Sequence, residues 1–334
     1  MKMKRSAQVW AILSHKQGWP FFVIAISVAL LFAPFNRAEG HAANDVFSLA
    51  GSENSRRNVG QDSTKADKKP AGQSRFKTLD GARIHYVNYG KGDDAIVLIH
   101  GWTMNVDNWR DQIPAFAMRH RVIAIDLPGH GQSDKPKVAY SMEYFARAVE
   151  AVMQHAKVKR AVLVGHSMGT PIARQFYRKY PEKTLGIVIV DGSLRPFGDK
   201  AMLDKMIGGL RGPTYKDVIN QMFTMMNGPN LSTEARERIS ASSSATPQYV
   251  LVSAMEGMAD ASIWGEDPIN VPVLAVMAKN PFLPPNVEES FRALAPKMEF
   301  HMWNDVGHFI MMEKPKEFNE ATLAFLEKNK LLSK

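Results

Sequence analysis

The sequence predicts an α/β protein built on a mostly parallel β-sheet. Short, continuously apolar runs recur along the chain, and segments with helical periodicity separate them. Continuous apolar runs are typical of strands covered on both faces, and strands that alternate with helices are joined by right-handed crossovers. Six runs show this pattern: "AIVLIHG", "RVIAIDLPGHG", "AVLVGHS", "LGIVIVDG", "VPVLAVMA" and "MEFHMW". Each run predicts one strand of the sheet.

An antiparallel hairpin precedes these runs and opens the folded domain near Phe76. "FKTL" and "ARIHYVNY" alternate as strands do, and the "DG" between them is a two-residue turn signal. Residues 43–75 before the hairpin are polar and lack apolar periodicity, so we expect a flexible linker there. The folded domain is therefore expected at residues 76–332.

One long segment, residues 195–268, interrupts the alternation after the strand predicted in "LGIVIVDG". It has no convincing strand, but its helix-like stretches predict a helical insertion, which we call the cap. The cap holds seven methionines: Met202, Met206, Met222, Met225, Met226, Met255 and Met258. With Phe223, Trp264 and Phe282 nearby, these flexible side chains either line an apolar substrate pocket or form the core of the cap itself.

Composition and charge are those of an ordinary globular protein. Of 334 residues, 45% are apolar and 22% are charged, which is enough to bury a sizeable core. The net charge is +9, but the sequence contains no dense Lys/Arg run and no nucleic-acid-binding motif, so we expect no nucleic-acid partner. The chain has no cysteine, which excludes disulfides, a lipid-bearing cysteine, a thiolate metal site and a thiol nucleophile. The oligomeric state stays open.

The first 42 residues have the order of a secretory signal. "MKMKR" is a basic start, "FFVIAISVALLFA" is an apolar core, and "GHA", which ends at Ala42, is a small-x-small cleavage site. We therefore expect export to a periplasm or beyond. The apolar core is shorter than the roughly 20 residues that span a bilayer. Because Trp19 and Phe35 extend it, an uncleaved N-terminal membrane anchor is the alternative, and it would be the only membrane contact.

A serine between two glycines carries the strongest chemical signal. In "GHSMG", residues 165–169, Ser167 lies where an apolar run stops and the helical segment "PIARQFYRKY" begins. A G-x-S-x-G sequence in this position is typical of a sharp strand-to-helix turn that raises the serine hydroxyl above the sheet edge. The two glycines leave room for neighbouring backbone to approach. We expect Ser167 to be a nucleophile.

A serine hydroxyl needs a base, and acyl transfer needs donors for an oxyanion. His308, in "WNDVGHFIMMEKPKEFN" between the last predicted strand and the last helix, is the best placed of the ten histidines. The backbone amides of Trp102, in the "IHGW" that ends a strand, and of Met168 are the expected oxyanion donors. His100 lies in the same turn as Trp102, and Asp126 lies at another strand end; we expect both to hold loops in place.

Together these motifs resemble those of the α/β-hydrolase superfamily over about residues 76–332. The resemblance rests on "HGW", "DLPGHGQSDKP", "GHSMG" and "VGHFIMMEKPKEFN", in the family's order and spacing. It implies a doubly wound, eight-stranded sheet in which only the second strand is antiparallel, with a helical cap after the sixth strand. It also implies that Ser167 carries an acyl group and that His308 acts as base and then as acid. Trp102 and Met168 would supply the oxyanion amides.

The resemblance leaves the acid of the triad open. Many members have an aspartate after the seventh strand, but "VLAVMAKNPFLPPNV" has no carboxylate. The family also uses the end of the sixth strand, where "IVIVDGS" offers Asp191, and we expect Asp191 to orient His308. Asp260 and Asp267, where the cap rejoins the sheet, are the alternatives, followed by a water or an amide. Asn280 would be a poor substitute, because a neutral amide stabilises an imidazolium weakly.

The predicted function is that of a serine hydrolase acting on carboxylic esters, lactones or similar acyl compounds through an acyl-enzyme on Ser167. Neither a metal nor an organic cofactor is expected, and the expected partner is a small, apolar substrate. Members of the same fold also act as cofactor-free perhydrolases or as carbon–carbon bond hydrolases. A degenerate member that only binds a ligand is a further alternative.

Overall fold

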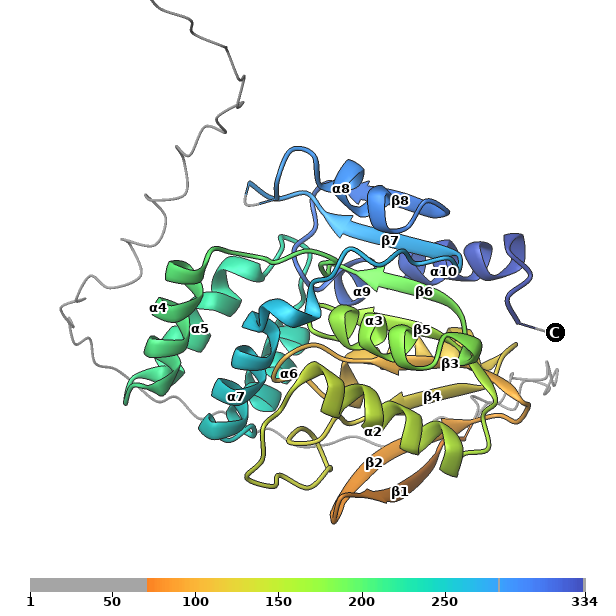
Figure 1. Ribbon diagram of the computed structural model, residues 1–334, viewed down its shortest axis with the longest axis horizontal. Helices are drawn as coiled ribbons and strands as arrows, with labels where there is room; N and C mark the ends of the chain where they lie inside the picture. Colours follow the sequence, from red (N-terminus) through yellow and green to blue (C-terminus); the bar gives the residue numbers. More distant parts are fainter. Residues whose placement is uncertain (1–70, 282, 333–334) are drawn as a thin grey trace, which may run out of the picture. The chain divides into compact units, whose positions relative to one another are not determined.

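The computed structural model describes residues 71–281 and 283–332, so the expected export signal, residues 1–42, lies outside the described residues. Within them, eight strands form one sheet in the order β1-β2-β4-β3-β5-β6-β7-β8 (Figure 1). The strands are β1 (Gln73–Leu79), β2 (Ala82–Tyr89), β3 (Asp94–Ile99), β4 (Val122–Ile125), β5 (Arg160–His166), β6 (Thr184–Val190), β7 (Val273–Ala278) and β8 (Met298–Trp303). Only β2 runs antiparallel to its neighbours, β1 and β4, and every other neighbouring pair is parallel. The predicted sheet is confirmed.

The hairpin of β1 and β2 turns at the predicted "DG". Asp80 and Gly81 both have a left-handed backbone, with φ of 49° and 82°. A two-residue turn with positive φ at both positions matches the twist of the strands on either side, and glycine adopts this conformation without strain.

The expected start of the folded domain at Phe76 is three residues too late, because β1 begins at Gln73. Gln73 pairs with Asn88, and the register continues without a break to the turn. β1 is an edge strand whose first four side chains are exposed. An exposed edge strand can hold polar residues. Residues 73–75 therefore have the same composition as the predicted linker, which is why the sequence places the boundary too late.

Helices cover both faces of the sheet. On one face lie α2 (Met142–His155), α3 (Gly169–Lys179) and α8 (Val287–Leu294); on the other lie α1 (Ile113–Ala117), α9 (Ile310–Glu313) and α10 (Pro315–Lys328). Successive residues of β3 belong to opposite cores: Val97 packs with the first group and Leu98 with the second. A strand buried on both faces needs an apolar residue at every position, which explains its unbroken apolar run.

The cap is helical, as expected. It comprises α4 (Lys200–Arg211), α5 (Tyr215–Met226), α6 (Thr233–Ser244), α7 (Gln248–Ala259) and the 3₁₀ turn η4 (Ala261–Ile263). Figure 1 shows these helices gathered at the carboxyl ends of the parallel strands. Met255 and Met258 are buried in the protein core, whereas Met225 is 55% exposed, so the cap methionines do not share one role. In the part of the chain that is described, no helix combines the length and apolarity needed to cross a bilayer.

Candidate active site

Ser167 occupies the turn between β5 and α3. Its φ of 52° is left-handed, a conformation that non-glycine residues adopt rarely and that clusters at functional sites. The Ser167 amide donates to the Val190 carbonyl at 3.0 Å, which fixes the turn against the end of β6. A Cβ at Gly165 would lie 2.4 Å from the Gly169 carbonyl oxygen, so the turn closes only with glycine at 165. The strand, the turn and the helix thus place the serine as the motif predicts.

Asp191 and His308 meet beside this turn. His308 Nδ1 lies 2.7 Å from Asp191 Oδ2, and the Ala278 amide donates to Asp191 Oδ1 at 2.8 Å. Both side chains are largely buried, with exposed fractions of 17% for His308 and 8% for Asp191. With both oxygens engaged, the carboxylate cannot rotate away. A carboxylate on Nδ1 puts the ring proton there and leaves the lone pair of His308 on Nε2.

The other acids considered for this position lie elsewhere. Asp260 accepts from the Ser262 amide at 2.9 Å and caps η4. Asp267 forms an ion pair with Arg178. Of the three aspartates, the structure therefore brings Asp191 alone to His308.

His166, which precedes the serine, links the two sides of the site. Its Nε2 donates to the His308 carbonyl oxygen at 3.0 Å, and the two rings lie 4.7 Å apart between centroids. The ring is fully enclosed, and burial, followed by the charge of His308, holds the pKa of His166 well below its usual value. A neutral His166 therefore positions the backbone of His308 next to Ser167. The only sequence signal for His166 is its place beside the nucleophile.

The hydroxyl of Ser167 makes no hydrogen bond with any group in residues 71–281 or 283–332. Nucleophile–base hydrogen bonds are often long in enzymes without substrate and shorten when substrate binds. The geometry therefore places Ser167 and His308 on neighbouring loops without a preformed bond between them.

The backbone amides of Trp102 and Met168 are both available as donors. Both residues are buried, at 6% and 1% exposure, and within the described residues neither amide donates a hydrogen bond. Buried amides without a partner are rare in folded proteins. A Cβ built on Gly101 would lie 3.1 Å from Ser167 Cβ, so the Trp102 loop runs directly against the serine. The positive end of α3 adds to the attraction for an anion at Met168.

The cap holds the Trp102 loop in place. Trp102 Nε1 donates to the Leu251 carbonyl of α7 at 3.0 Å, and Ser242 Oγ of α6 donates to the Thr103 carbonyl at 2.7 Å. Thr103 has a φ of 67°, which is strained for a β-branched residue and needs such external contacts. The cap therefore helps to set the geometry of an expected oxyanion donor.

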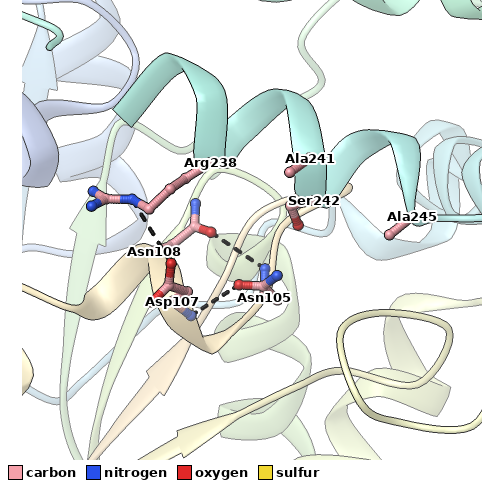
Figure 2. A pocket seen from close by; sticks show the side chains of 7 residues that line it. All are labelled: Asn105, Asp107, Asn108, Arg238, Ala241, Ser242 and Ala245. Carbon is pink, nitrogen blue, oxygen red and sulfur yellow. Dashed lines mark hydrogen bonds and ion pairs between the residues drawn. The ribbon is translucent and has the colours of Figure 1, made fainter. Parts of the chain in front are cut away.

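A pocket of about 240 Å³ lies beside this loop, between the 3₁₀ turn η2 (Val106–Trp109) and α6. Figure 2 shows its lining residues: Asn105, Asp107, Asn108, Arg238, Ala241, Ser242 and Ala245. Some of its polar groups bond to one another: Asn105 caps η2, and Arg238 lies 3.8 Å from Asp107 as an ion pair. Within the described residues, Asn108 Nδ2 and Arg238 Nε have no hydrogen-bond partner. None of the residues at Ser167 lines it, so the pocket is separate from the candidate active site.

Glu313 joins the cap to the loop that carries His308. Its carboxylate accepts from the Gly307 amide at 2.9 Å, from the Gly228 amide at 3.2 Å and from the Asn230 amide at 3.3 Å. A Cβ at Gly228 would lie 2.1 Å from the Gly307 nitrogen, so the two backbones are in contact. The His308 amide also donates to the Met226 carbonyl of α5 at 2.8 Å.

Replacing Glu313 with glutamine is expected to lower both stability and kcat. The carboxylate is 8% exposed, and an amide keeps only one acceptor oxygen for three backbone donors. We expect a loss of about 1–3 kcal/mol in the free energy of unfolding, measured by urea denaturation, and about tenfold in kcat as the His308 loop loosens. Glu317→Gln, on an exposed position of α10, is the matched control and should change neither. Equal behaviour of the two variants would contradict the role of Glu313.

His100 and Asp126 hold loops, as expected. The Leu127 amide donates to His100 Nε2 at 3.0 Å, and His100 Nδ1 donates to the Gly101 carbonyl at 2.8 Å. Burial lowers the pKa of His100. Burial, reinforced by His100, lowers the pKa of His130 to about 3. With His166, three enclosed histidines are therefore neutral in the folded protein.

Because these three histidines stay neutral in the folded protein, we expect the protein to lose stability in mild acid. The unfolded chain binds a proton at each histidine as pH falls below about 6.5, whereas the folded protein does not, so stability is complete above that pH and declines below it. At pH 5, the failure of the buried His130 to take up a proton should by itself lower the free energy of unfolding by about 2 kcal/mol. Urea midpoints should be constant above about pH 7.5 and fall steadily between pH 6.5 and 5. A flat midpoint across that window would contradict the account.

No group of three or more His, Cys, Asp or Glu side chains suited to a metal ion is present among residues 71–281 and 283–332.

Comparisons with known proteins agree with this fold. A family model described as an alpha/beta hydrolase fold matches residues 94–212. The chain is 35% identical over 124 residues to the dihydrolipoyllysine-residue acetyltransferase component of the acetoin cleaving system of Cupriavidus necator, which covers 37% of this chain and 33% of that protein. The chain thus spans about a third of that relative's length. It is 27% identical over 263 residues to a 2-hydroxy-6-oxononadienedioate/2-hydroxy-6-oxononatrienedioate hydrolase of Paraburkholderia phymatum, over 73% of this chain and 91% of that protein.

Solved structures give the same class. A structure described as an N-acyl homoserine lactone degrading enzyme superimposes with a TM-score of 0.66 at 29% identity, over 75% of this chain and 100% of that chain. An esterase from Exiguobacterium antarcticum superimposes with a TM-score of 0.70 over 76% of this chain and 100% of its own, and at 18% identity it shows the fold alone. The chain belongs to the α/β-hydrolase superfamily, a class of enzymes, as its motifs predict.

Proposed function

We propose that the chain is a serine hydrolase of carboxylic esters or lactones that forms an acyl-enzyme on Ser167. The observation that carries this proposal is the 2.7 Å contact between His308 Nδ1 and Asp191 Oδ2 at the strand ends next to Ser167. A carboxylate on Nδ1 leaves the lone pair on Nε2 that a general base requires. The strained turn at Ser167 supports the same role, because local strain persists where surrounding structure enforces a reactive geometry.

In the proposed reaction, Ser167 Oγ attacks the carbonyl carbon while His308 Nε2 takes the hydroxyl proton. The amides of Trp102 and Met168 donate to the oxyanion that forms. His308 then protonates the leaving alkoxide, and the acyl group stays on Ser167. Water, deprotonated by the same imidazole, releases the acid, and Asp191 stabilises the imidazolium in both halves of the reaction.

The proposed substrates have an apolar acyl group. Phe223 of α5 lies 6.5 Å from Trp102 and 6.0 Å from Phe309, between ring centroids. One cap side chain thus contacts the loop of an oxyanion donor and the residue after His308. The structural neighbour described as degrading N-acyl homoserine lactones supports lactones within this class.

The test is kcat/KM of the full chain against p-nitrophenyl esters of graded acyl length, with N-acyl lactones beside them. We expect kcat/KM to rise about fourfold for each methylene group that becomes buried. Phe223→Ala should flatten this dependence, and Met225→Ala, on an exposed position of the same helix, is the matched control. Failure to turn over any ester or lactone would contradict the proposed function. A dependence on acyl length that Phe223→Ala leaves unchanged would contradict the proposed apolar contact.

A carbon–carbon bond hydrolase is the second candidate. It is favoured by the 27% identity to the Paraburkholderia phymatum hydrolase, which extends over 91% of that protein. The compound in that relative's name, 2-hydroxy-6-oxononadienedioate, belongs in the same panel. Turnover of this compound above that of every ester would move the assignment to carbon–carbon bond cleavage.

We also propose that residues 1–42 direct export. The basic start, the apolar core and the small residues before position 43 support this proposal. N-terminal sequencing of the exported protein should find a chain that begins after Ala42. An intact Met1 in the membrane fraction would instead indicate an uncleaved anchor.

A further inference from the structure

A second serine–histidine–aspartate chain of hydrogen bonds lies outside the Ser167 site. His85 Nδ1 lies 2.7 Å from Asp126 Oδ2, and Ser74 Oγ lies 2.9 Å from His85 Nε2. Ser74 is on β1, His85 is on β2 and Asp126 directly follows β4. These are three neighbouring strands at one edge of the sheet, so the register of the sheet holds the three side chains together.

Asp126 determines which nitrogen of His85 carries the proton. Its side chain is 1% exposed and also accepts from the Val106 amide at 2.8 Å and the Gln132 amide at 2.9 Å. Burial favours the neutral acid, but the hydrogen bonds from His85 and from these amides hold the pKa of Asp126 below its usual value. An ionised carboxylate only accepts, so His85 Nδ1 donates to it. Nε2 of the neutral ring then accepts, and the Ser74 hydroxyl donates.

The nucleophile in this arrangement is open to solvent, whereas the base is not. Ser74 is exposed on the edge strand, and the His85 side chain is 1% exposed. The Phe76 ring lies 5.1 Å from the His85 ring, and Ser133 Oγ accepts from the His85 amide at 2.8 Å. A serine within reach of a base that a third group orients is the arrangement that activates a nucleophile.

We propose that Ser74 is a second nucleophilic serine, which takes an acyl group from a carboxylic ester or lactone while His85 acts as its base and Asp126 orients His85. Ser74 Oγ forms a bond to the carbonyl carbon, and the bond from that carbon to the leaving alkoxide breaks. The proton passes from Oγ to His85 Nε2 and from there to the alkoxide. From an ester, the products are an ester on Ser74 and the free alcohol. From a lactone, the single product is a hydroxyacyl ester on Ser74, whose new hydroxyl is the former ring oxygen.

The modification is expected to persist. Ser74 lies within a strand, and in the described part of the chain it has no counterpart of the strand-to-helix turn that offers a free amide next to Ser167. Without preorganised oxyanion donors, hydrolysis of the new ester is slow. Ser74 therefore takes up one acyl group per chain and does not turn over.

The test uses the full chain with Ser167→Ala, so that the principal proposed nucleophile is absent. The probes are p-nitrophenyl acetate and a fluorophosphonate, and peptide mass spectrometry measures the rate of labelling at each serine. Ser240, exposed on α6 and without a histidine partner among the residues that the structure describes, is the reference within the same molecule. A positioned base contributes about 10²–10⁴-fold, so we expect Ser74 to be labelled at least about 10²-fold faster than Ser240.

His85→Gln in the same background should reduce labelling of Ser74 to the rate of Ser240. Since His85 is buried, thermal unfolding first checks that this variant folds; if it does not, the ratio of Ser74 to Ser240 in the parent decides alone. Equal rates at the two serines, or unchanged labelling of Ser74 in a folded His85→Gln protein, would overturn the proposal. The test is independent of Ser167, because unlabelled Ser167 in the unmodified chain would contradict the proposed function only.

Discussion

Replacing Ser167 with alanine is expected to lower kcat by about 10⁶, because no acyl-enzyme forms without the hydroxyl. Stability should change by less than about 0.5 kcal/mol, since the hydroxyl has no hydrogen-bond partner in the described residues and both side chains meet the same backbone strain. The measurement is kcat on the best ester of the panel, together with thermal unfolding.

Ser240→Ala is the matched control for this prediction. Ser240 is an exposed serine on α6, and its loss should leave kcat within about twofold of wild type. Turnover by Ser167→Ala above about a tenth of wild type would remove Ser167 from the role of nucleophile.

The second large effect is expected for Asp191→Asn, which should lower kcat by about 10⁴. Asparagine can still accept from the Ala278 amide through its oxygen, but its NH₂ group then faces His308 Nδ1. Two donors cannot share that bond, so the ring turns or takes the wrong tautomer, and the imidazolium loses its partner.

Two other aspartates provide the controls for Asp191. Asp260→Asn and Asp267→Asn should keep kcat within tenfold of wild type, because Asp260 caps a 3₁₀ turn and Asp267 forms an ion pair with Arg178. Circular dichroism confirms the fold of each variant. If Asp191→Asn stays within tenfold while one of the others falls by about a thousandfold, the assignment moves to that residue.

The sheet and the nucleophile turn were predictable because their signals are local. A strand covered on both faces must be apolar at each position, so β3, β5 and β6 are visible in the sequence without any knowledge of their neighbours. The turn at Ser167 needs two glycines within five residues, and Gly165 is required by the close approach of the Gly169 backbone.

The contacts that surround the nucleophile were not predictable in this way. His166 meets the His308 backbone across 142 residues of sequence, and Glu313 reaches Gly228 across 85. Neither side chain belongs to a pattern with a fixed period. The partner of His166 lies on the loop after β8, and partners of Glu313 lie in the cap, so tertiary packing decides both sets of contacts. Ser74 was missed for a related reason, since polar residues on an exposed edge strand resemble a linker. His85 lies in a predicted strand, but its partners come from β1 and from the end of β4, which lie apart from it in sequence.

The cap forms part of the candidate active site. Trp102 donates to α7, Thr103 accepts from α6, and the His308 amide donates to the end of α5. Three cap helices thus contact the loops of an expected oxyanion donor and the expected base. Substitutions in the cap that weaken these contacts should change kcat as well as KM, because they shift donors and not only substrate contacts.

The most direct measurement identifies the residue that carries the acyl group during turnover. The full chain is mixed with a slowly hydrolysed p-nitrophenyl ester, quenched in acid and digested, and the acylated peptide is found by mass spectrometry. We expect one acyl group on Ser167, formed faster than any on Ser74, and absent from that site in Ser167→Ala. Steady turnover of the ester by a protein whose Ser167 peptide never carries an acyl group would contradict it.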